Sequence, residues 1–138
     1  MRIPLLQLVI ICLLASCAKQ ETDSQRFLIK ANEQLRLKEY NAAIRLYGEA
    51  IGRKADYPEA YNNRGIAWYE QGKHFEAIQD FTQALRIDTS FHDAYFNRIN
   101  AYLDGGYYER GLADCQRLKR YYPDSALVWS MQGMFLNA

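Results

Sequence analysis

The chain contains little of what metal sites require. Three cysteines and two histidines occur among its 138 residues. His74 and His92 stand far apart, and neither lies near a pair of cysteines at the spacing that metal ligands need. We therefore expect both histidines at turns or helix caps, and we predict that the chain holds no metal and no other cofactor.

Uncompensated charge is also absent. The formal net charge is +1, and removal of residues 1–16 would leave sixteen basic against sixteen acidic side chains. Nucleic-acid binding requires a cluster of unpaired basic charge, so we expect no nucleic-acid partner. The sequence has no nucleophile elbow, no phosphate-binding loop and no pair of catalytic carboxylates, which indicates that the chain is not an enzyme.

One short apolar run stands near the N-terminus. It follows Arg2, extends over residues 3–15 and is interrupted by Pro4 and Gln7. The run is shorter than the roughly 20 residues that span a bilayer, and it lacks the polar face that a helix packed on a soluble core would show. We interpret residues 1–16 as a targeting segment rather than as a core helix.

The end of this run carries a short motif. Residues 14–17, Leu-Ala-Ser-Cys, resemble the lipobox of bacterial lipoproteins. The resemblance implies cleavage before Cys17, lipid on that cysteine and a polar tether over 17–23, and more than one acyl chain makes such anchoring stable. Ala18, rather than an acidic residue, follows the cysteine, which implies an outer-membrane destination. We expect a lipid-anchored protein of the bacterial cell envelope, with its folded domain in the periplasm.

The remainder of the chain repeats itself every 34 residues. One column of the repeat holds an aromatic residue in all four copies, and further columns hold small or apolar residues. Because the columns share one register without an insertion, we infer a chain built from internal repeats. The columns are Phe27, Tyr61, Tyr95 and Trp129; Ala43, Ala77 and Gly111; Tyr47, Phe81 and Cys115; and Ala50, Ala84 and Leu118.

Each repeat contains two apolar patterns with helical spacing. In the middle repeat one stripe runs from Tyr61 to Trp68 and a second from Phe75 to Leu85, with Gly72 in the turn between them. Proline at first-turn positions and side-chain oxygens at caps fit the same division. The patterns predict helices over 24–37, 41–53, 58–71, 74–87, 92–104, 108–121 and 126–136.

This spacing resembles the tetratricopeptide repeat, in which an aromatic residue, Leu-Gly and Tyr are followed by Ala, Phe and Pro. Arg64 replaces the leucine and Thr89 the proline in the middle repeat. The resemblance implies an all-α, right-handed superhelical solenoid of stacked helix-turn-helix units. About three and a half repeats fill 24–138, as units at 24–57, 58–91 and 92–125 and a partial repeat or capping helix at 126–138.

Two details of the register concern packing inside the units. Arg64 and Arg98 are each followed sixteen residues later by an aspartate, Asp80 or Asp114. This spacing predicts ion pairs between the two helices of a unit, with independent solvation as the alternative. Ile99 is larger than the residue usual at its position and Gly111 is smaller, so we hypothesise that Ile99 fills the space beside Gly111.

The first helix of each unit lines the concave groove in related proteins. Apolar and amide side chains are mixed there, which suits an extended peptide or a partner helix, because amides bind backbone groups while apolar side chains form pockets. Packing between repeats is the alternative role, above all for Ile66 and Leu103. The predicted groove residues are Leu28, Asn32, Leu35, Asn62, Ile66, Tyr69, Phe96, Asn100 and Leu103.

The sequence does not resemble the chaperone adaptors of this family at their peptide-binding positions. Chaperone adaptors of this family clamp the C-terminal carboxylate of a peptide between cations and amides. Asn32 and Asn63 match the amide positions, whereas Leu28, Asp93 and Asn97 stand where the cations would be. Without those cations a carboxylate gains little, so we expect no clamp of this kind.

The last predicted helix is unusually apolar for the end of a stack. Either the stack continues beyond this sequence or the helix meets a second copy or another protein. We expect a non-enzymatic adaptor that docks peptides or helices of envelope proteins in its groove, similar to small repeat lipoproteins. The alternative is a self-associating structural protein, a homodimer through Trp129, Met134 and Phe135.

Overall fold

The computed structural model describes residues 5–138, and ahead of Thr22 it describes the side chains of Gln7, Ile10, Ser16, Ala18 and Lys19 alone. Over this range the chain forms seven helices and no strand, which confirms the predicted all-α solenoid. The helices are α1 (Leu5–Arg36), α2 (Tyr40–Arg53), α3 (Pro58–Glu70), α4 (His74–Ile87), α5 (His92–Asp104), α6 (Tyr108–Tyr121) and α7 (Ala126–Leu136).

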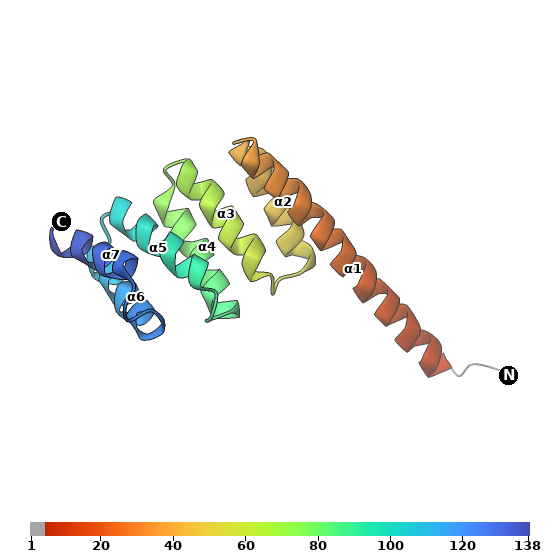
Figure 1. Ribbon diagram of the computed structural model, residues 1–138. Coiled ribbons are helices and arrows are strands. Elements are labelled where there is room, and N and C mark those ends of the chain that lie inside the picture. Colours follow the sequence, from red (N-terminus) through yellow and green to blue (C-terminus); the bar gives the residue numbers. More distant parts are fainter. Residues whose placement is uncertain (1–4) are drawn as a thin grey trace.

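The helices are arranged as a single curved stack (Figure 1). Each helix packs against the next one along the chain, and α1, α3, α5 and α7 also contact one another in that order. The three even-numbered helices make no such contacts among themselves. The odd-numbered helices therefore form the inner, concave side of the superhelix, where successive units lie closest.

Helix α1 differs from the prediction at its start. It begins at Leu5 instead of residue 24, and the expected polar tether at 17–23 belongs to the helix. The physical reason is that residues 5–36 contain no glycine or proline and that the polar stretch is rich in good helix formers such as Ala18, Lys19 and Glu21. The N-terminal part of α1 extends beyond the stack (Figure 1).

The other helix ends agree with the predicted ranges to within one residue. The turns inside the units share one left-handed position, at Lys38, Gly72 and Gly106, with φ of 61°, 73° and 76°. Glycine adopts this conformation freely, whereas in lysine the Cβ is crowded. The turn predicted around Gly72 thus recurs at the same register in all three units.

The proposed lipid attachment point is not described. Residues 1–4 and the Cys17 side chain lie outside the described part of the structure. In the part that is described, no helix combines the length and the apolar character needed to cross a membrane.

The buried apolar side chains form two clusters that meet at α3. One joins α1, α2 and α3 around Tyr47, and the other joins α4 to α7 around Phe81 and Leu118. Tyr61 and Trp68 of α3 pack against the second cluster. The column of Tyr47, Phe81 and Cys115 is almost completely buried, as expected for the residues that hold each unit together.

Both predicted ion pairs are confirmed. The Arg64 guanidinium donates two hydrogen bonds of 2.7 Å to the Asp80 carboxylate, and these bonds raise the pKa of Arg64. Arg98 donates to Asp114 at 2.7 and 2.9 Å and also to the Thr82 hydroxyl at 2.9 Å. The Arg98–Asp114 pair is buried, since its side chains are only 8% and 2% exposed. It therefore lies inside the stack and not at its solvent-exposed edge.

The hypothesis that Ile99 fills the space beside Gly111 is wrong, because another residue occupies that space. The three atoms nearest to a Cβ built on Gly111 all belong to the ring of Phe135, on α7. One repeat earlier, 34 residues before Gly111 and Phe135, the equivalent residues are Ala77 and Ala101. Two repeats earlier both positions again hold alanine. An alanine pair is thus replaced by a glycine and a phenylalanine. Phe135 is only 7% exposed, which also removes it from the surface expected to form a homodimer.

Candidate binding groove

The nine predicted groove residues differ in how far they are exposed to solvent. Leu28 and Asn62 are buried, and Leu28 belongs to the core around Tyr47. Asn100 is exposed, and the other six are half-buried. Ile66 and Leu103 pack against the second core cluster, which supports the packing role that we weighed for them. The groove surface is therefore more polar than the sequence indicated.

A chain of asparagine amides crosses the concave side from α1 to α5. Asn63 donates to the Oδ1 of Asn32 at 3.1 Å, Asn62 donates to Asn63 at 3.1 Å, and Asn97 donates to Asn62 at 3.0 Å. We call these four residues the asparagine ladder. The Tyr47 hydroxyl donates to Asn32 at 2.7 Å and so anchors the ladder to the core. The amides hold one another in place and join three consecutive units.

A hollow of about 340 Å³ opens beside the ladder, between the first turns of α3 and α5. Three carboxylates line it, those of Glu59, Asp88 and Asp93, and no lysine or arginine does. Hydrogen bonds from the Ser90 hydroxyl and backbone N–H lower the pKa of Asp88, which keeps this carboxylate charged. The other lining residues are Pro58, Asn62, Asn63 and Phe91. The hollow therefore favours positive charge and hydrogen-bond donors.

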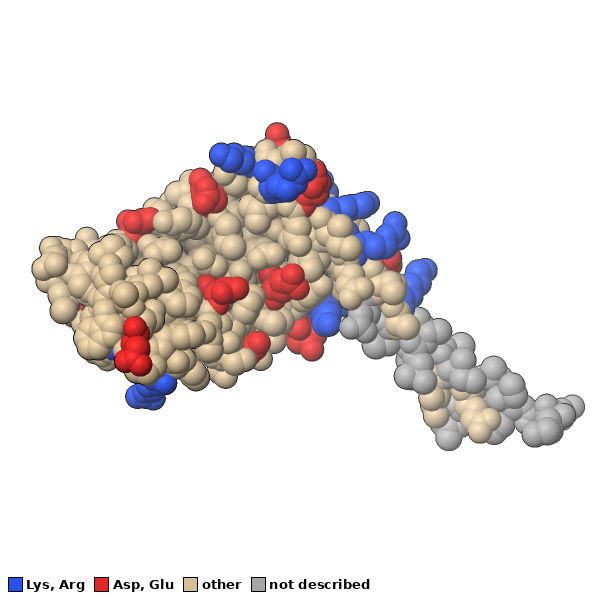
Figure 2. All heavy atoms as spheres, in the orientation of Figure 1, with Lys and Arg blue, Asp and Glu red and all other residues tan. Residues whose placement is uncertain are grey.

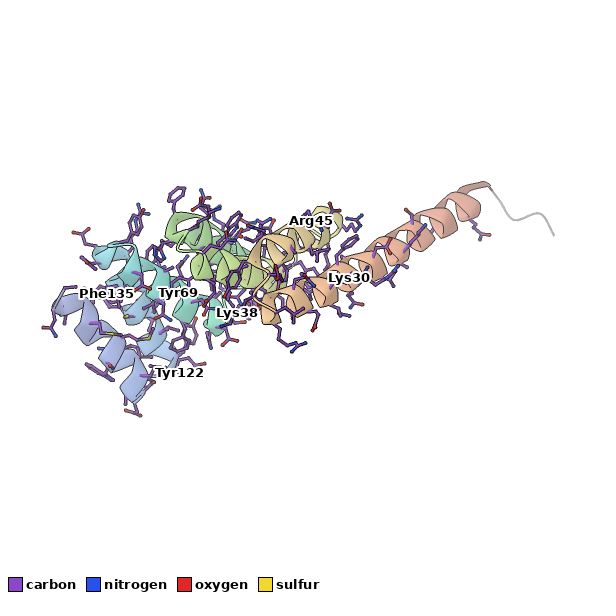
Figure 3. All side chains as sticks on the ribbon, turned by 90° about the horizontal axis from the view of Figure 1, so that it is seen from above. Lys30, Lys38, Arg45, Tyr69, Tyr122 and Phe135 are labelled. Atoms are coloured by element: carbon purple, nitrogen blue, oxygen red, sulfur yellow. The ribbon has the colours of Figure 1, made fainter. Side chains whose placement is uncertain are left out.

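Side-chain contacts between units also lie at both ends of the inner helices α3 and α5. The Tyr69 hydroxyl donates to the Asp104 carboxylate, and this bond raises the pKa of Tyr69 to about 12. The ring of Phe96 lies against Tyr122, whose hydroxyl is 2.6 Å from Nδ1 of His92. Figure 3 labels Tyr69, on α3, and Tyr122, which follows α6, at separate places in the stack. Tyr69 and Phe96 are thus already engaged with neighbouring units.

Sequence reasoning missed several of these residues. The sequence pattern indicated Asn97 only as a lost cation of the clamp and Asp88 only as a capping residue, and it gave no role to Tyr122. The register offered a signal for Asn97, because it stands 34 residues after Asn63. No sequence signal places Asp88 beside Asp93, since the turn between α4 and α5 decides it.

A larger hollow of about 770 Å³ lies on the opposite side, between α4 and α6. Arg86, Arg110 and Arg117 line it together with the buried pair of Arg98 and Asp114. Arg117 donates to Asp114 at 3.0 Å, so part of this positive charge is already compensated. Over the described residues, no group of His, Cys, Asp or Glu side chains is arranged to hold a metal ion.

A stack of helical pairs with a polar inner groove defines a class of protein, the helical-repeat solenoid. A tetratricopeptide repeat family model matches residues 30–90. Residues 30–90 therefore carry the tetratricopeptide repeat pattern. The small glutamine-rich tetratricopeptide repeat-containing protein 2 of Mycosarcoma maydis is 34% identical over 94 residues, which cover 68% of this chain and 27% of that protein. The chain thus spans about a quarter of that relative's length.

Solved structures show the same fold. The first tetratricopeptide domain of Spaghetti (RPAP3), bound to the HSP90 peptide SRMEEVD, superimposes with a TM-score of 0.79 at 20% identity and covers 85% of this chain and 93% of that one. The Arabidopsis OM64 domain gives a TM-score of 0.78 at 25% identity, with 86% and 98% covered.

Proposed function

We propose that this protein is a non-enzymatic adaptor that docks an extended segment of a partner along the inner face of α1, α3 and α5. The observation that carries the proposal is the acidic hollow beside the asparagine ladder. An extended peptide presents unpaired backbone N–H and C=O groups, and carboxylates and amides are suitable partners for them. Leu35 of α1 and Phe96 of α5 are half-buried and pack against the two core clusters.

The charge of the hollow selects the chemistry of the partner. The peptide bound to Spaghetti (RPAP3), SRMEEVD, contains three acidic residues. In this chain Glu59, Asp88 and Asp93 would repel such a ligand. We therefore propose a segment with lysine or arginine side chains as the natural partner.

The location of the adaptor is part of the proposal. The lipobox-like residues 14–17 support a lipid anchor on Cys17 and a periplasmic domain that recruits envelope proteins. The helical 17–23 segment would then hold the repeats at a distance from the membrane surface. Mass spectrometry of the N-terminus from native membranes tests this, since an unmodified Cys17 or a retained Met1 contradicts the anchor.

Peptide binding can be tested without knowledge of the partner. The purified chain is titrated against short random-sequence peptides of graded charge and against SRMEEVD. We expect basic peptides to bind and SRMEEVD not to bind. Glu59→Gln with Asp93→Asn should weaken binding of the basic peptides by roughly tenfold, because two charges leave the hollow.

The matched control is Glu109→Gln, an exposed acid in the first turn of α6 on the other side of the stack. It should leave peptide binding unchanged. Equal binding of SRMEEVD, or an equal loss in the control, would contradict the proposed groove.

A further inference from the structure

The hollow of about 770 Å³ on the outer side of the stack is a trough between α4 and α6. These two helices do not contact each other over their described lengths, because each packs against α5 instead. The buried side chains of Arg98, Tyr102 and Asp114 form the floor of the trough. Since each unit of a solenoid contacts only its neighbours, further units would lengthen the stack and leave this trough open.

Three exposed arginines stand around the trough. Arg86 belongs to α4, whereas Arg110 and Arg117 belong to α6, so both walls contribute positive charge. We call these three residues the rim arginines. Arg117 pairs with the buried Asp114 at 3.0 Å. Neither Arg86 nor Arg110 forms an ion pair with any of the described residues.

The carboxylates that line the trough do not neutralise the rim arginines. Asp80 and Asp114 are both buried in the floor. Arg64 donates two hydrogen bonds to Asp80, and Arg98 donates two to Asp114. Each aspartate is thus already matched by one arginine from an inner helix, and the charge of the rim arginines is left in excess. A ligand with carboxylates would compensate this charge.

The rim arginines are not part of the repeat pattern. The residues 34 positions before them are Gly52, Glu76 and Gln83, none of which is basic. In contrast, the arginine that packs inside a unit does recur, at Arg64 and Arg98. A residue that every unit needs for its packing returns with the period, so the rim arginines are a property of this one trough and not of the fold.

We propose that the trough docks a helix of a partner protein that carries a stripe of acidic side chains. Arg110 and Arg117 are seven residues apart in the sequence, which is about two turns and about 10 Å along α6. Acidic residues seven positions apart on a guest helix have the same separation and share one face. Arg86 faces this stripe from the opposite wall.

The trough suits a helix better than an extended peptide or a nucleic acid. A helix forms its backbone hydrogen bonds internally, so it requires only side-chain contacts from the trough. Phe75, which lines the trough and is 58% exposed, offers an apolar contact beside the charges. A nucleic acid carries a charge on every phosphate, more than three arginines match. The heptapeptide SRMEEVD is too short to present acids seven positions apart.

Fluorescence anisotropy with a synthetic helix tests the docking on the full-length chain. The labelled probe has about 22 residues and consists mostly of alanine, which makes it helical in water. Glutamate stands at every seventh position, and leucine follows each glutamate three residues later. A second peptide of the same composition has glutamate at every fifth position, which spreads the acids around the helix. We expect the first peptide to bind about fivefold more tightly. Equal affinities, or no binding of the first peptide, would overturn the proposal.

A pair of double variants locates the contact. Arg86→Gln with Arg110→Gln should weaken binding of the first peptide roughly tenfold, because two charges leave the trough. Arg45→Gln with Arg120→Gln is the control, since both residues are exposed, lie outside the trough and remove the same charge. It should leave the affinity unchanged. Circular dichroism must show unchanged helicity in both proteins. An equal loss in the control would reveal unspecific attraction and overturn the proposed site.

Charge reversal provides a gain that damage to the fold cannot produce. Arg86→Glu with Arg110→Glu should bind the same peptide with lysine in place of glutamate, about tenfold more tightly than the unchanged chain does. Both proteins carry Glu59→Gln with Asp93→Asn in this comparison, which excludes the acidic hollow of the concave side. No gain would overturn the proposal, as would tighter binding of a single-stranded oligonucleotide than of the glutamate peptide. Glu59→Gln with Asp93→Asn alone should leave binding of the glutamate peptide unchanged, so this test is independent of the concave groove.

Discussion

The second and third units solve the same packing problem with different side chains. In the α3–α4 unit a small residue, Gly65, receives the large ring of Phe81. In the α5–α6 unit the equivalent positions hold Ile99 and Cys115, both almost completely buried. The large residue has moved from the outer helix to the inner one. What the register fixes is therefore the volume shared by two helices, and not which helix supplies it.

The ion pairs of these two units differ in burial. The Arg64 side chain is 24% exposed and its pair borders solvent, whereas Arg98 and Asp114 are enclosed and tied to Thr82 and Arg117. A charge that remains in water after its partner is removed is solvated, but a buried one is not. Although the two ion pairs have similar geometry, removal of the aspartate should therefore lower the free energy of unfolding more in the α5–α6 unit than in the α3–α4 unit. On the face drawn in Figure 2, most of the visible Lys and Arg side chains lie towards the α1–α2 end of the stack.

The largest expected effect separates the two ion pairs. Asp114→Ala should destabilise the protein by about 3 to 5 kcal/mol, because it leaves Arg98 buried without its partner. Asp80→Ala should cost only about 1 to 2 kcal/mol, since Arg64 is in part solvated. Urea unfolding followed by circular dichroism measures both, with exposed Asp124→Ala as the control. Equal losses would show that burial does not distinguish the units.

Transfer of the Ile99 and Cys115 side chains to the equivalent positions 65 and 81 should change the free energy of unfolding by an intermediate amount. Gly65→Ile alone overfills the α3–α4 unit against Phe81 and should cost about 1 to 3 kcal/mol. Addition of Phe81→Cys recreates the combination of Ile99 and Cys115 and should recover much of that loss. A double-mutant cycle in urea gives the coupling energy. If the two changes are simply additive, the exchange of volume between helices is not the reason for the difference.

The smallest effect is expected where α6 packs against α7. Phe135 of α7 lies there, at the opposite end of the stack from Lys30 and Lys38 (Figure 3). Gly111→Ala should destabilise by about 1 kcal/mol, because the Phe135 ring occupies the space of the new Cβ. In a Phe135→Ala background the same change should stabilise, by restoring the alanine pair of the preceding units. Melting temperatures measure the change of sign. Stabilisation in both backgrounds would mean that the ring moves aside freely.

Gly48→Ala is the control for helix propensity. Gly48 lies inside α2, and a built Cβ meets only an Arg64 side-chain atom at 3.8 Å, an ordinary contact. This variant should gain about 0.5 to 1 kcal/mol, the usual advantage of alanine over glycine inside a helix. The comparison separates backbone entropy from the clash with Phe135.

Much of the fold could be predicted because its signals are local. Apolar spacing and turn residues gave the ends of α2 to α7 to within one residue. The start of α1 could not be predicted in this way, since a polar composition was read as a connector although helix formers fill the stretch. Of the groove, the sequence identified the inner helices, but Leu28 and Asn62 proved to be buried.

The sequence by itself determined the number of units, their pairing of helices and the ion pairs at positions 64 and 98, because these follow from one 34-residue period. Only the tertiary structure decided which neighbour fills each small residue, as Phe135 does at Gly111. It also decided that the asparagines bond to one another and that Asp88 joins Asp93 in one hollow. Such contacts join different helices, and the distances between their side chains depend on how closely the units stack.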